Sequence, residues 1–547
     1  MVSLKRLTVV GFASQAAGRS IKRTPSPVAS VDCNGQTYTY EGLAGFGSLP
    51  SDARDQYGDT ISIGSSMAIK EWRRFGDRYE GTMYGLPDRG WNTNGTQNTI
   101  PRVHIFNLSF TVTAATVSHP SGPNVEFKYQ RTILLSGPDG KPMTGLDPDF
   151  IGGLAYPGFP SMPATTYPGD GFGGSGPGDR RISIDAEGLV VEDDGSFWIS
   201  DEYGPFLYRF DTNGQMTAAI QPPDALLPVR NGIVSFNSNT PPIYNSSMIP
   251  SPVDPIHGRQ NNQGFEGLTI SPDGKTLWAM LQSATEQDGG ASSSTRRNTR
   301  LLKYNLNRRV KDGVEVRYEA EYVVPLPTYE NDKGEIRVAA QSEIHYVSDT
   351  QMFVLARDSD AGRGQGDALS RYRHVDIVDI SGATNIKGPR FDDMQHGNIT
   401  VGGISNPSDE LVAGITPSKL CPFIDYNINA ELNKFKTAEG DVVHNGEPVN
   451  LGLLNEKWEA LALVPVINNG EGKSKEKSKS KSCYEKSENN EYYLFTLSDN
   501  DFITNDGYAN FGKIHFVDDS ATVPFLNSQA LVFKITLPRA QRKQVAC

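Results

Sequence analysis

The sequence lacks the local motifs of the commonest hydrolases and metalloenzymes. It contains no Gly-x-Ser-x-Gly, so a nucleophile elbow is not predicted, and no His-Glu-x-x-His, so the metalloprotease zinc motif is excluded. The 8 histidines form no close pair, which disfavours a zinc site built from neighbouring residues. No apolar run reaches the roughly 18 residues that a membrane-spanning helix needs. Any catalytic site must therefore come from residues far apart in the chain.

Basic residues are outnumbered by acidic residues. The 547 residues include 52 Lys and Arg against 64 Asp and Glu, a formal net charge of -12. Binding to nucleic acid depends on neutralising phosphates with basic side chains, so a nucleic-acid partner is disfavoured. We expect a monomer that acts on a small molecule.

Cysteines are few, and none has the Cys-x-x-Cys spacing of a redox or metal motif. The four are Cys33, Cys421, Cys483 and Cys547. Their even number favours one or two disulfides in an oxidising compartment, and four free thiols are the alternative.

The first 30 residues have the order of a short secretion signal followed by a processed segment. Lys5 and Arg6 precede an apolar stretch at residues 7–13, and the dibasic pair Lys22-Arg23 follows. Four glycosylation sequons begin at Asn94, Asn107, Asn245 and Asn398. Together these features predict a secreted glycoprotein whose residues 1–30 are removed.

The rest of the chain is rich in turns and in short β-type runs. It has 55 Gly and 35 Pro, and alternating segments such as residues 103–113 are typical of half-buried strands. Asp-Gly pairs such as those at residues 139–140 and 273–274 are hairpin signals, because both residues tolerate positive φ. The fold class is therefore all-β.

One pattern occurs four times: a Glu, apolar residues, then a strand that ends in polar or charged residues. The four units begin at Glu187, Glu266, Glu343 and Glu459. Their strand ends carry Asp201-Glu202, Gln282, Arg357-Asp358 and Asp499-Asn500-Asp501. A related unit at residues 62–90 lacks the Glu and ends in Asp88-Arg89.

Repeated antiparallel units of this size predict a β-propeller, and we expect six or seven blades. Residues 31–547 would form this single domain, with insertions at about 156–180 and at about 468–491, where the second is rich in Lys and Ser. The large aromatic residues before the strand ends would pack between blades. They are Trp198, Trp278, Phe353 and Phe495.

Equivalent ends of equivalent strands meet at one mouth of a propeller channel, so the repeated carboxylates would converge there. Crowded carboxylates need protons, arginines or a hard cation, and Ca²⁺ suits a ring of oxygen ligands. The expected metal ligands are Glu187, Asp201, Glu202, Glu266, Glu343, Asp358, Glu459, Asp499 and Asp501. As an alternative, the glutamates brace neighbouring blades by accepting backbone amide hydrogen bonds.

Several strings resemble the phytase-like family, also called the esterase-like activity of phytase family. They are Tyr-Gly-Leu-Pro-Asp-Arg-Gly-Trp-Asn at 84–92, Phe-Trp-Ile-Ser-Asp-Glu-Tyr-Gly-Pro at 197–205, the stretch 264–278, and the short matches at 355–358, 458–462 and 497–502. The resemblance spans most of the chain and implies a β-propeller that hydrolyses esters or phosphate esters.

The expected function is a secreted hydrolase of phosphate or carboxylic esters with a metal-assisted carboxylate site. Glu187 or Glu266 would be the general base, while Arg89, Arg357 and Tyr203 would contact the substrate. Two alternatives remain open: a lactonase-like hydrolase that depends on Ca²⁺, and a propeller that binds a ligand without catalysis.

Overall fold

The computed structural model describes residues 26–307, 315–468, 490–520 and 526–539. Within these ranges the chain is almost entirely β-structure, and its single α-helix, α1 (Asn429–Leu432), has 4 residues. The expected leader at residues 1–30 and the Lys-rich insertion at about 468–491 lie almost wholly outside the described residues, as do Cys483 and Cys547.

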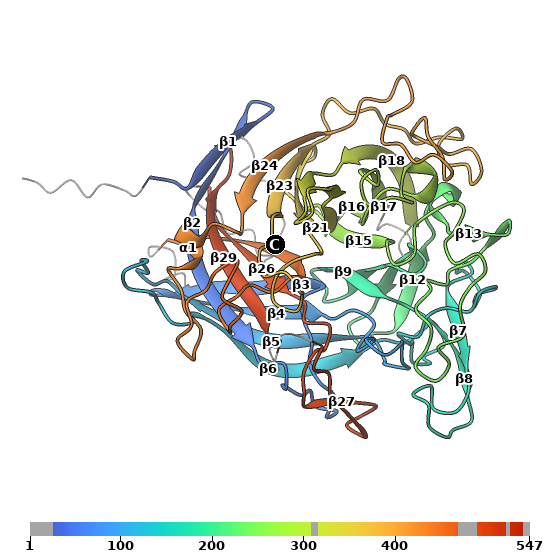
Figure 1. Ribbon diagram of the computed structural model, residues 1–547, viewed down its shortest axis with the longest axis horizontal. Coiled ribbons are helices and arrows are strands. Elements are labelled where there is room, and N and C mark those ends of the chain that lie inside the picture. The colour runs from blue at the N-terminus through green and yellow to red at the C-terminus, as the bar shows by residue number, and fades with distance from the viewer. Residues whose placement is uncertain (1–25, 308–314, 469–489, 521–525, 540–547) are drawn as a thin grey trace, which may run out of the picture.

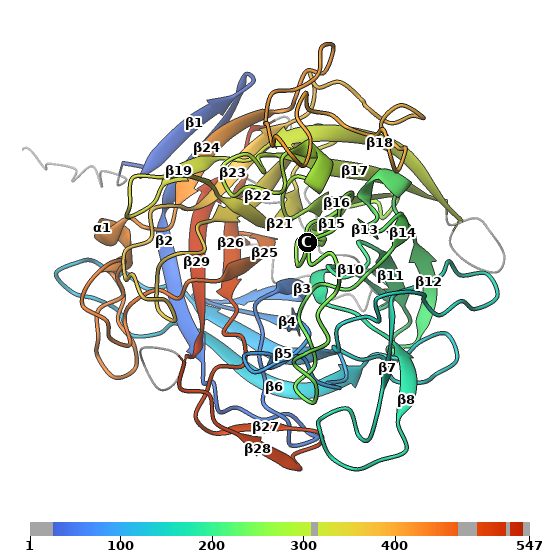
Figure 2. The same cartoon turned by 45° about the vertical axis from the view of Figure 1, so that its right-hand side comes forward.

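Five antiparallel sheets surround a common axis (Figures 1 and 2), so the prediction of a β-propeller is confirmed. The first blade is β3 (Ser66–Phe75), β4 (Arg78–Leu86), β5 (Arg102–Thr111) and β6 (Val125–Leu134). The second is β9 (Ala186–Val191), β10 (Phe197–Asp201), β11 (Leu207–Phe210) and β12 (Met216–Ile220).

The third blade is β15 (Phe265–Ile270), β16 (Thr276–Leu281), β17 (Asn298–Asn307) and β18 (Glu315–Pro325). The fourth is β21 (Ala340–Tyr346), β22 (Gln351–Arg357), β23 (Arg373–Asp379) and β24 (Lys419–Asp425). The fifth joins both ends of the chain: β25 (Trp458–Pro465), β26 (Glu491–Ser498), β29 (Ser528–Thr536), β2 (Gln36–Leu49) and β1 (Ala29–Cys33).

The expected count of six or seven blades is wrong, because each sequence repeat supplies one blade and long loops. Four short hairpins outside the blades take up part of that length. They are β7 (Ala164–Tyr167) with β8 (Asp179–Ile182), β13 (Val229–Arg230) with β14 (Ile233–Val234), β19 (Thr328–Glu330) with β20 (Ile336–Val338), and β27 (Gly507–Ala509) with β28 (Ile514–Phe516). The Gly/Pro-rich stretch at about 156–180 contributes β7 and the start of β8.

The core is divided among the five interfaces between neighbouring blades, each filled by one apolar cluster. The aromatic residues that precede the ends of the repeated strands each belong to a different cluster and are fully buried, as predicted. They are Trp198, Trp278, Phe353 and Phe495. A ring of such interfaces fixes the inner strands β3, β9, β15, β21 and β25 around the axis.

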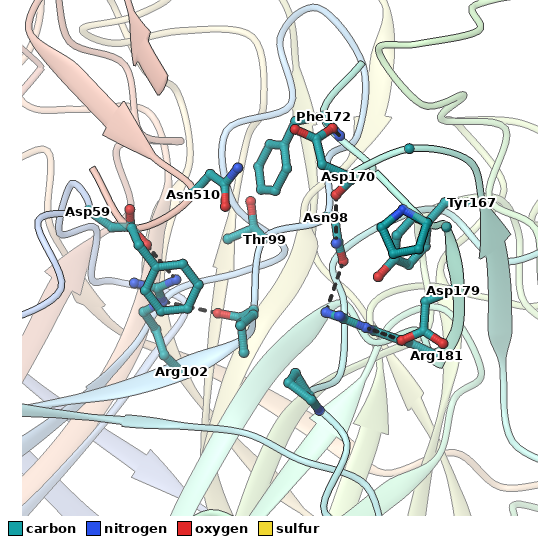
Figure 3. A pocket seen from close by; sticks show the side chains of 16 residues that line it. Asp59, Asn98, Thr99, Arg102, Tyr167, Asp170, Phe172, Asp179, Arg181 and Asn510 are labelled. Carbon is teal, nitrogen blue, oxygen red and sulfur yellow. Dashed lines mark hydrogen bonds and ion pairs between the residues drawn. The ribbon is translucent and has the colours of Figure 1, made fainter. Parts of the chain in front are cut away.

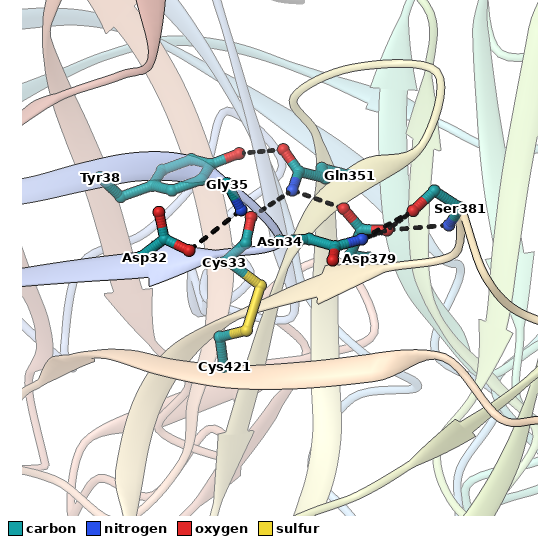
Figure 4. The surroundings of a disulfide bond; sticks show 9 residues. All are labelled: Asp32, Cys33, Asn34, Gly35, Tyr38, Gln351, Asp379, Ser381 and Cys421. Atoms are coloured by element: carbon teal, nitrogen blue, oxygen red, sulfur yellow. Dashed lines mark hydrogen bonds between the residues drawn. A yellow bond between two sulfur atoms is a disulfide. The ribbon is translucent and has the colours of Figure 1, made fainter.

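A disulfide closes the ring between the fifth and fourth blades. Cys33, at the end of β1, is bonded to Cys421 of β24 across 388 residues of sequence (Figure 4). Gln351 reinforces the contact, since its Nε2 donates to the Cys33 carbonyl at 3.1 Å and its Oε1 accepts from the Tyr38 hydroxyl at 2.7 Å. One of the predicted disulfides is therefore present.

Candidate functional site

A polar cavity of about 440 Å³ lies where the inner strands begin, and we call it the axial cavity. Eight carboxyl groups and three basic side chains line it. The acidic residues are Asp88, Asp185, Glu187, Glu202, Glu266, Glu456, Glu459 and Asp501, and the basic residues are Arg89, Arg357 and Lys457. Residues 261–263, Gln282 and a few other polar side chains complete the wall.

β-bulges aim three of the repeated glutamates into this cavity. In β9, β15 and β25 the inner strand has one residue more than its partner strand at Glu187, Glu266 and Glu459 respectively. A bulge re-aims the side chain of the extra residue and increases the local twist. The Gly that follows Glu187 and the Gly that follows Glu266 have no room for a Cβ, because the neighbouring inner strand lies against them. The Glu-Gly pair thus combines a re-aimed carboxylate with close packing of blades.

Glu343 of β21 differs from the other three by one position. In this strand the extra residue is Ser342, and Glu343 pairs with Leu355 in the ladder. A shift of one residue turns a side chain to the opposite face of a strand. Glu343 therefore lies outside the lining of the axial cavity.

Glu343 instead joins blades across the axis. Its Oε1 accepts the amides of Leu268 and Ile344, both at 2.9 Å, and its Oε2 accepts the Ser66 hydroxyl. Ser66 Oγ in turn accepts the Leu189 amide at 3.0 Å. This network ties β21, β15, β3 and β9 together, so the bracing alternative holds for this glutamate.

Three carboxylates of the second blade form the densest acidic group. Asp185, Glu187 and Glu202 each offer one oxygen, and these atoms lie within 4.8 Å of one another. All three residues are buried, and among the described residues Glu202 Oε1 has no hydrogen-bond partner. Burial, followed by the negative charges of Glu266 and of the two other triad members, raises the pKa of Glu187 well above its usual value. An all-oxygen set with an unsatisfied buried atom fits a hard cation such as Ca²⁺.

Glu266 faces this triad from the third blade. Its Oε1 accepts the side-chain amide of Gln282, and within the described chain its buried Oε2 has no partner. Burial, then the carboxylates of Glu202 and Glu459, raise the pKa of Glu266 well above the ordinary range. A carboxylate of raised pKa beside a candidate cation site suits proton transfer.

The basic side chains are already paired with carboxylates. Arg89 Nη1 lies 2.6 Å from Asp185 Oδ2, while Arg357 contacts Glu456 and lies 2.5 Å from Glu459. Lys457 Nζ lies 2.7 Å from an oxygen of Asp501. Arg89 and Arg357 thus line the cavity, and there they offset buried negative charge.

Four other predicted site residues lie outside the cavity lining. Asp201 accepts the amides of Asp185, Tyr203 and Gly204, and Asp358 accepts the amides of Arg371 and Tyr372. Asp201 thus stabilises the turn after β10, and Asp358 stabilises the connection between β22 and β23.

The remaining two support the site from outside it. Tyr203 is fully buried and donates its hydroxyl to the Gly145 carbonyl at 2.9 Å. Asp499 accepts the hydroxyls of Ser62 and Ser65 and the amide of Asp501, and burial raises its pKa to about 6.

Sequence reasoning missed Asp185, Glu456 and Lys457. A signal was present, because each lies two or three residues before a repeated glutamate, in Asp-Ala-Glu and in Glu-Lys-Trp-Glu. The bulge that turns the glutamate inward starts in the same short segment, so it brings these neighbours to the cavity as well.

One family model and one curated protein match most of this chain. A family model described as phytase-like, esterase-like activity of phytase, matches residues 77–472. A protein of Arthroderma benhamiae, described as an uncharacterized secreted protein, is 48% identical over 494 residues, which cover 88% of this chain and 91% of that protein.

Similarity to solved structures is weak. An exo-1,5-α-L-arabinanase from a bovine ruminal metagenomic library matches with TM-score 0.22 and 10% identity, over 64% of this chain and 91% of that one. A luciferin-regenerating enzyme matches with TM-score 0.23 and 9% identity, over 89% and 97%. The described residues include no helix that is long and apolar enough to cross a membrane.

Proposed function

The chain belongs to the phytase-like family with esterase-like activity of phytase, and from this premise we propose that it is a secreted, metal-dependent ester hydrolase. The observation that carries the proposal is the buried triad of Asp185, Glu187 and Glu202 with its unsatisfied oxygen. The secreted relative and the disulfide support an extracellular location.

Asp185, Glu187 and Glu202 would hold a divalent cation, with Ca²⁺ the best match to an all-oxygen set. When bound, such an ion polarises an ester oxygen and offsets the surplus of carboxylates. Glu266 faces the triad and would accept the proton of the attacking water. Gln282 holds one oxygen of Glu266 by its amide, which leaves the other oxygen available for that proton.

The charge of the cavity bears on the choice of substrate. Eight carboxyl groups against three paired basic side chains repel an anion, so a phosphate ester would enter only with cations bound. A neutral carboxylic ester meets no such barrier, and we expect it to be the better substrate. Arg89 and Arg357 would contact an anionic group only by giving up part of their present carboxylate contacts.

The test is a set of hydrolysis assays on the purified chain with p-nitrophenyl butyrate, p-nitrophenyl phosphate, phytate and δ-valerolactone, each with added Ca²⁺ and with a chelator. We expect ester turnover that the chelator abolishes. Glu266→Gln should lower kcat by about 10²–10⁴, the usual contribution of a general base. Glu343→Gln is the matched control, since it alters a buried glutamate of the same repeat outside the cavity.

The outcomes separate the alternatives. Turnover of the lactone alone would identify a lactonase-like hydrolase. Binding of these compounds without turnover would support a ligand-binding propeller and refute the proposal. Turnover that is insensitive to both the chelator and Glu202→Gln would refute the metal-dependent part.

A further inference from the structure

A second cavity, of about 360 Å³, lies away from the axis, and we call it the lateral cavity (Figure 3). Its wall comes from the segment before β5, the β7–β8 hairpin and the turn after β27. It shares no lining residue with the axial cavity, although residues 88–102 contribute to both. Its volume falls within the roughly 300–1,000 Å³ of small-molecule sites.

Three aromatic rings give this cavity apolar surfaces. Tyr167 is almost fully buried, Phe172 is half-buried, and Phe511 is 41% exposed. Phe511 has φ 59°, in the left-handed region that bulky residues avoid, while the preceding Asn510, a residue type that tolerates this region, has φ 54°. A left-handed Phe costs about 1–3 kcal/mol, and such conformations are concentrated at ligand sites. The exposed ring of Phe511 thus lies at the cavity in a strained backbone conformation.

Two arginines and three aspartates line the cavity, and four of these five side chains form two ion pairs. Asp59 Oδ2 lies 3.0 Å from Arg102 Nη2, and Asp179 Oδ2 lies 3.2 Å from Arg181 Nε. In Figure 3 the first pair lies on one side of the cavity, together with Asn510, and the second pair lies on the other.

Further polar side chains are held in place by their neighbours. Asp170 Oδ1 accepts the amides of Phe172 and Gly174, both at 2.9 Å, and Asn98 Nδ2 donates to the Asp170 carbonyl at 2.9 Å. The site therefore presents fixed donors and acceptors, with one carboxylate more than arginines in its lining.

We propose that the lateral cavity binds a neutral sugar ring. Each lining arginine is already paired with an aspartate and one further aspartate is present, so the cavity offers no unpaired positive charge to a phosphate. A sugar has apolar C–H faces that fit aromatic rings, and vicinal hydroxyls that fit amide, carboxylate and guanidinium groups. This inference is independent of whether the axial cavity hydrolyses esters.

The experiment measures binding of glucose, mannose, galactose, N-acetylglucosamine, laminarin and yeast mannan to the full chain by isothermal titration calorimetry. Measurements in a chelator separate this site from the axial one, and we expect the same affinity with and without it. Phe511→Ala and Asn510→Ala should each weaken binding at least tenfold. Phe75→Ala, which removes an exposed ring (57%) outside both cavities, should leave it unchanged.

Thermal unfolding of each variant shows whether it is folded, and Asn510→Ala keeps the test valid if Phe511→Ala is not. Saturable binding of at least one of these sugars that both variants weaken would support the proposal. No binding of any of them, binding that the two variants do not change, or tighter binding of inorganic phosphate or glucosamine at the same residues would overturn it.

Discussion

Replacing Glu343 with Gln tests whether this glutamate is a buried, protonated brace between blades, unlike the glutamates that line the axial cavity. Burial outweighs the three hydrogen bonds to Glu343 and raises its pKa to about 8. The folded protein therefore keeps this proton up to about pH 8, where a Gln of the same shape can replace the neutral acid. At about pH 4.5 and below, where the acid is protonated in the folded and in the unfolded chain, we expect the free energy of unfolding to change by less than about 1 kcal/mol, the net worth of one hydrogen bond.

Glu343→Ala should behave differently, because it removes the acceptor of the Leu268 and Ile344 amides and of the Ser66 hydroxyl. Buried donors left unsatisfied cost about 1–3 kcal/mol each, so we expect a loss of about 3–5 kcal/mol after partial relaxation.

The pH dependence has a definite sign. The pKa of Glu343 is raised in the folded state, so its contribution to stability is fully present below about pH 4.5, the value in the unfolded chain. It declines as the pH rises and is lost once the pH passes about 8. The slope is up to about 1.4 kcal/mol per pH unit, so the whole window amounts to at most about 5 kcal/mol.

Urea denaturation of wild type and Glu343→Gln from pH 4 to pH 9 measures this difference directly. The variant should gain stability relative to wild type as the pH rises, and Glu80→Gln, at an exposed ion pair, should follow wild type throughout. Equal pH slopes for wild type and Glu343→Gln would refute the assignment of Glu343 as a buried, protonated brace.

Three further predictions concern the ring closure and the axial cavity. Cys33→Ser or Cys421→Ser should lower the free energy of unfolding by about 2–5 kcal/mol, and reduced wild type should match these variants in urea denaturation; no change on reduction would contradict this. Arg357→Met leaves Glu456 and Glu459 without their buried partner and should cost about 3–5 kcal/mol at pH 8. This loss of unfolding free energy should be smaller at pH 5, because Glu456 has a pKa of about 7 and is protonated there. An equal loss at pH 5 and pH 8 would be evidence against the pairing. Ca²⁺ affinity, measured by calorimetry, should increase from pH 5 to pH 8, since the buried carboxyls of raised pKa must release protons before they bind the ion; a flat profile would argue against this cation site.

The fold could be predicted from the sequence because the same apolar pattern recurs from blade to blade. Trp198 and its equivalents could be assigned to the interfaces between blades from their position alone, since each blade must bury the same face against the next. The number of blades could not be predicted from the sequence, because loops and hairpins between the repeats add length without adding blades.

The candidate site could be predicted from the sequence only in part, for a different reason. The repeated glutamates are equivalent in the sequence, yet the extra residue in β21 is Ser342, so Glu343 alone turns away from the cavity. A one-residue difference in register leaves the composition of a repeat unchanged but reverses the direction of a side chain.

By itself, the sequence determined an all-β propeller whose repeats each bring a carboxylate to the start of an inner strand. It did so because periodic burial and turn chemistry are local properties of the chain. Only the tertiary structure decided which carboxylates meet, that the arginines are already paired, and that a second cavity exists beside β7. These depend on β-bulges and on contacts between distant loops, which no local pattern encodes.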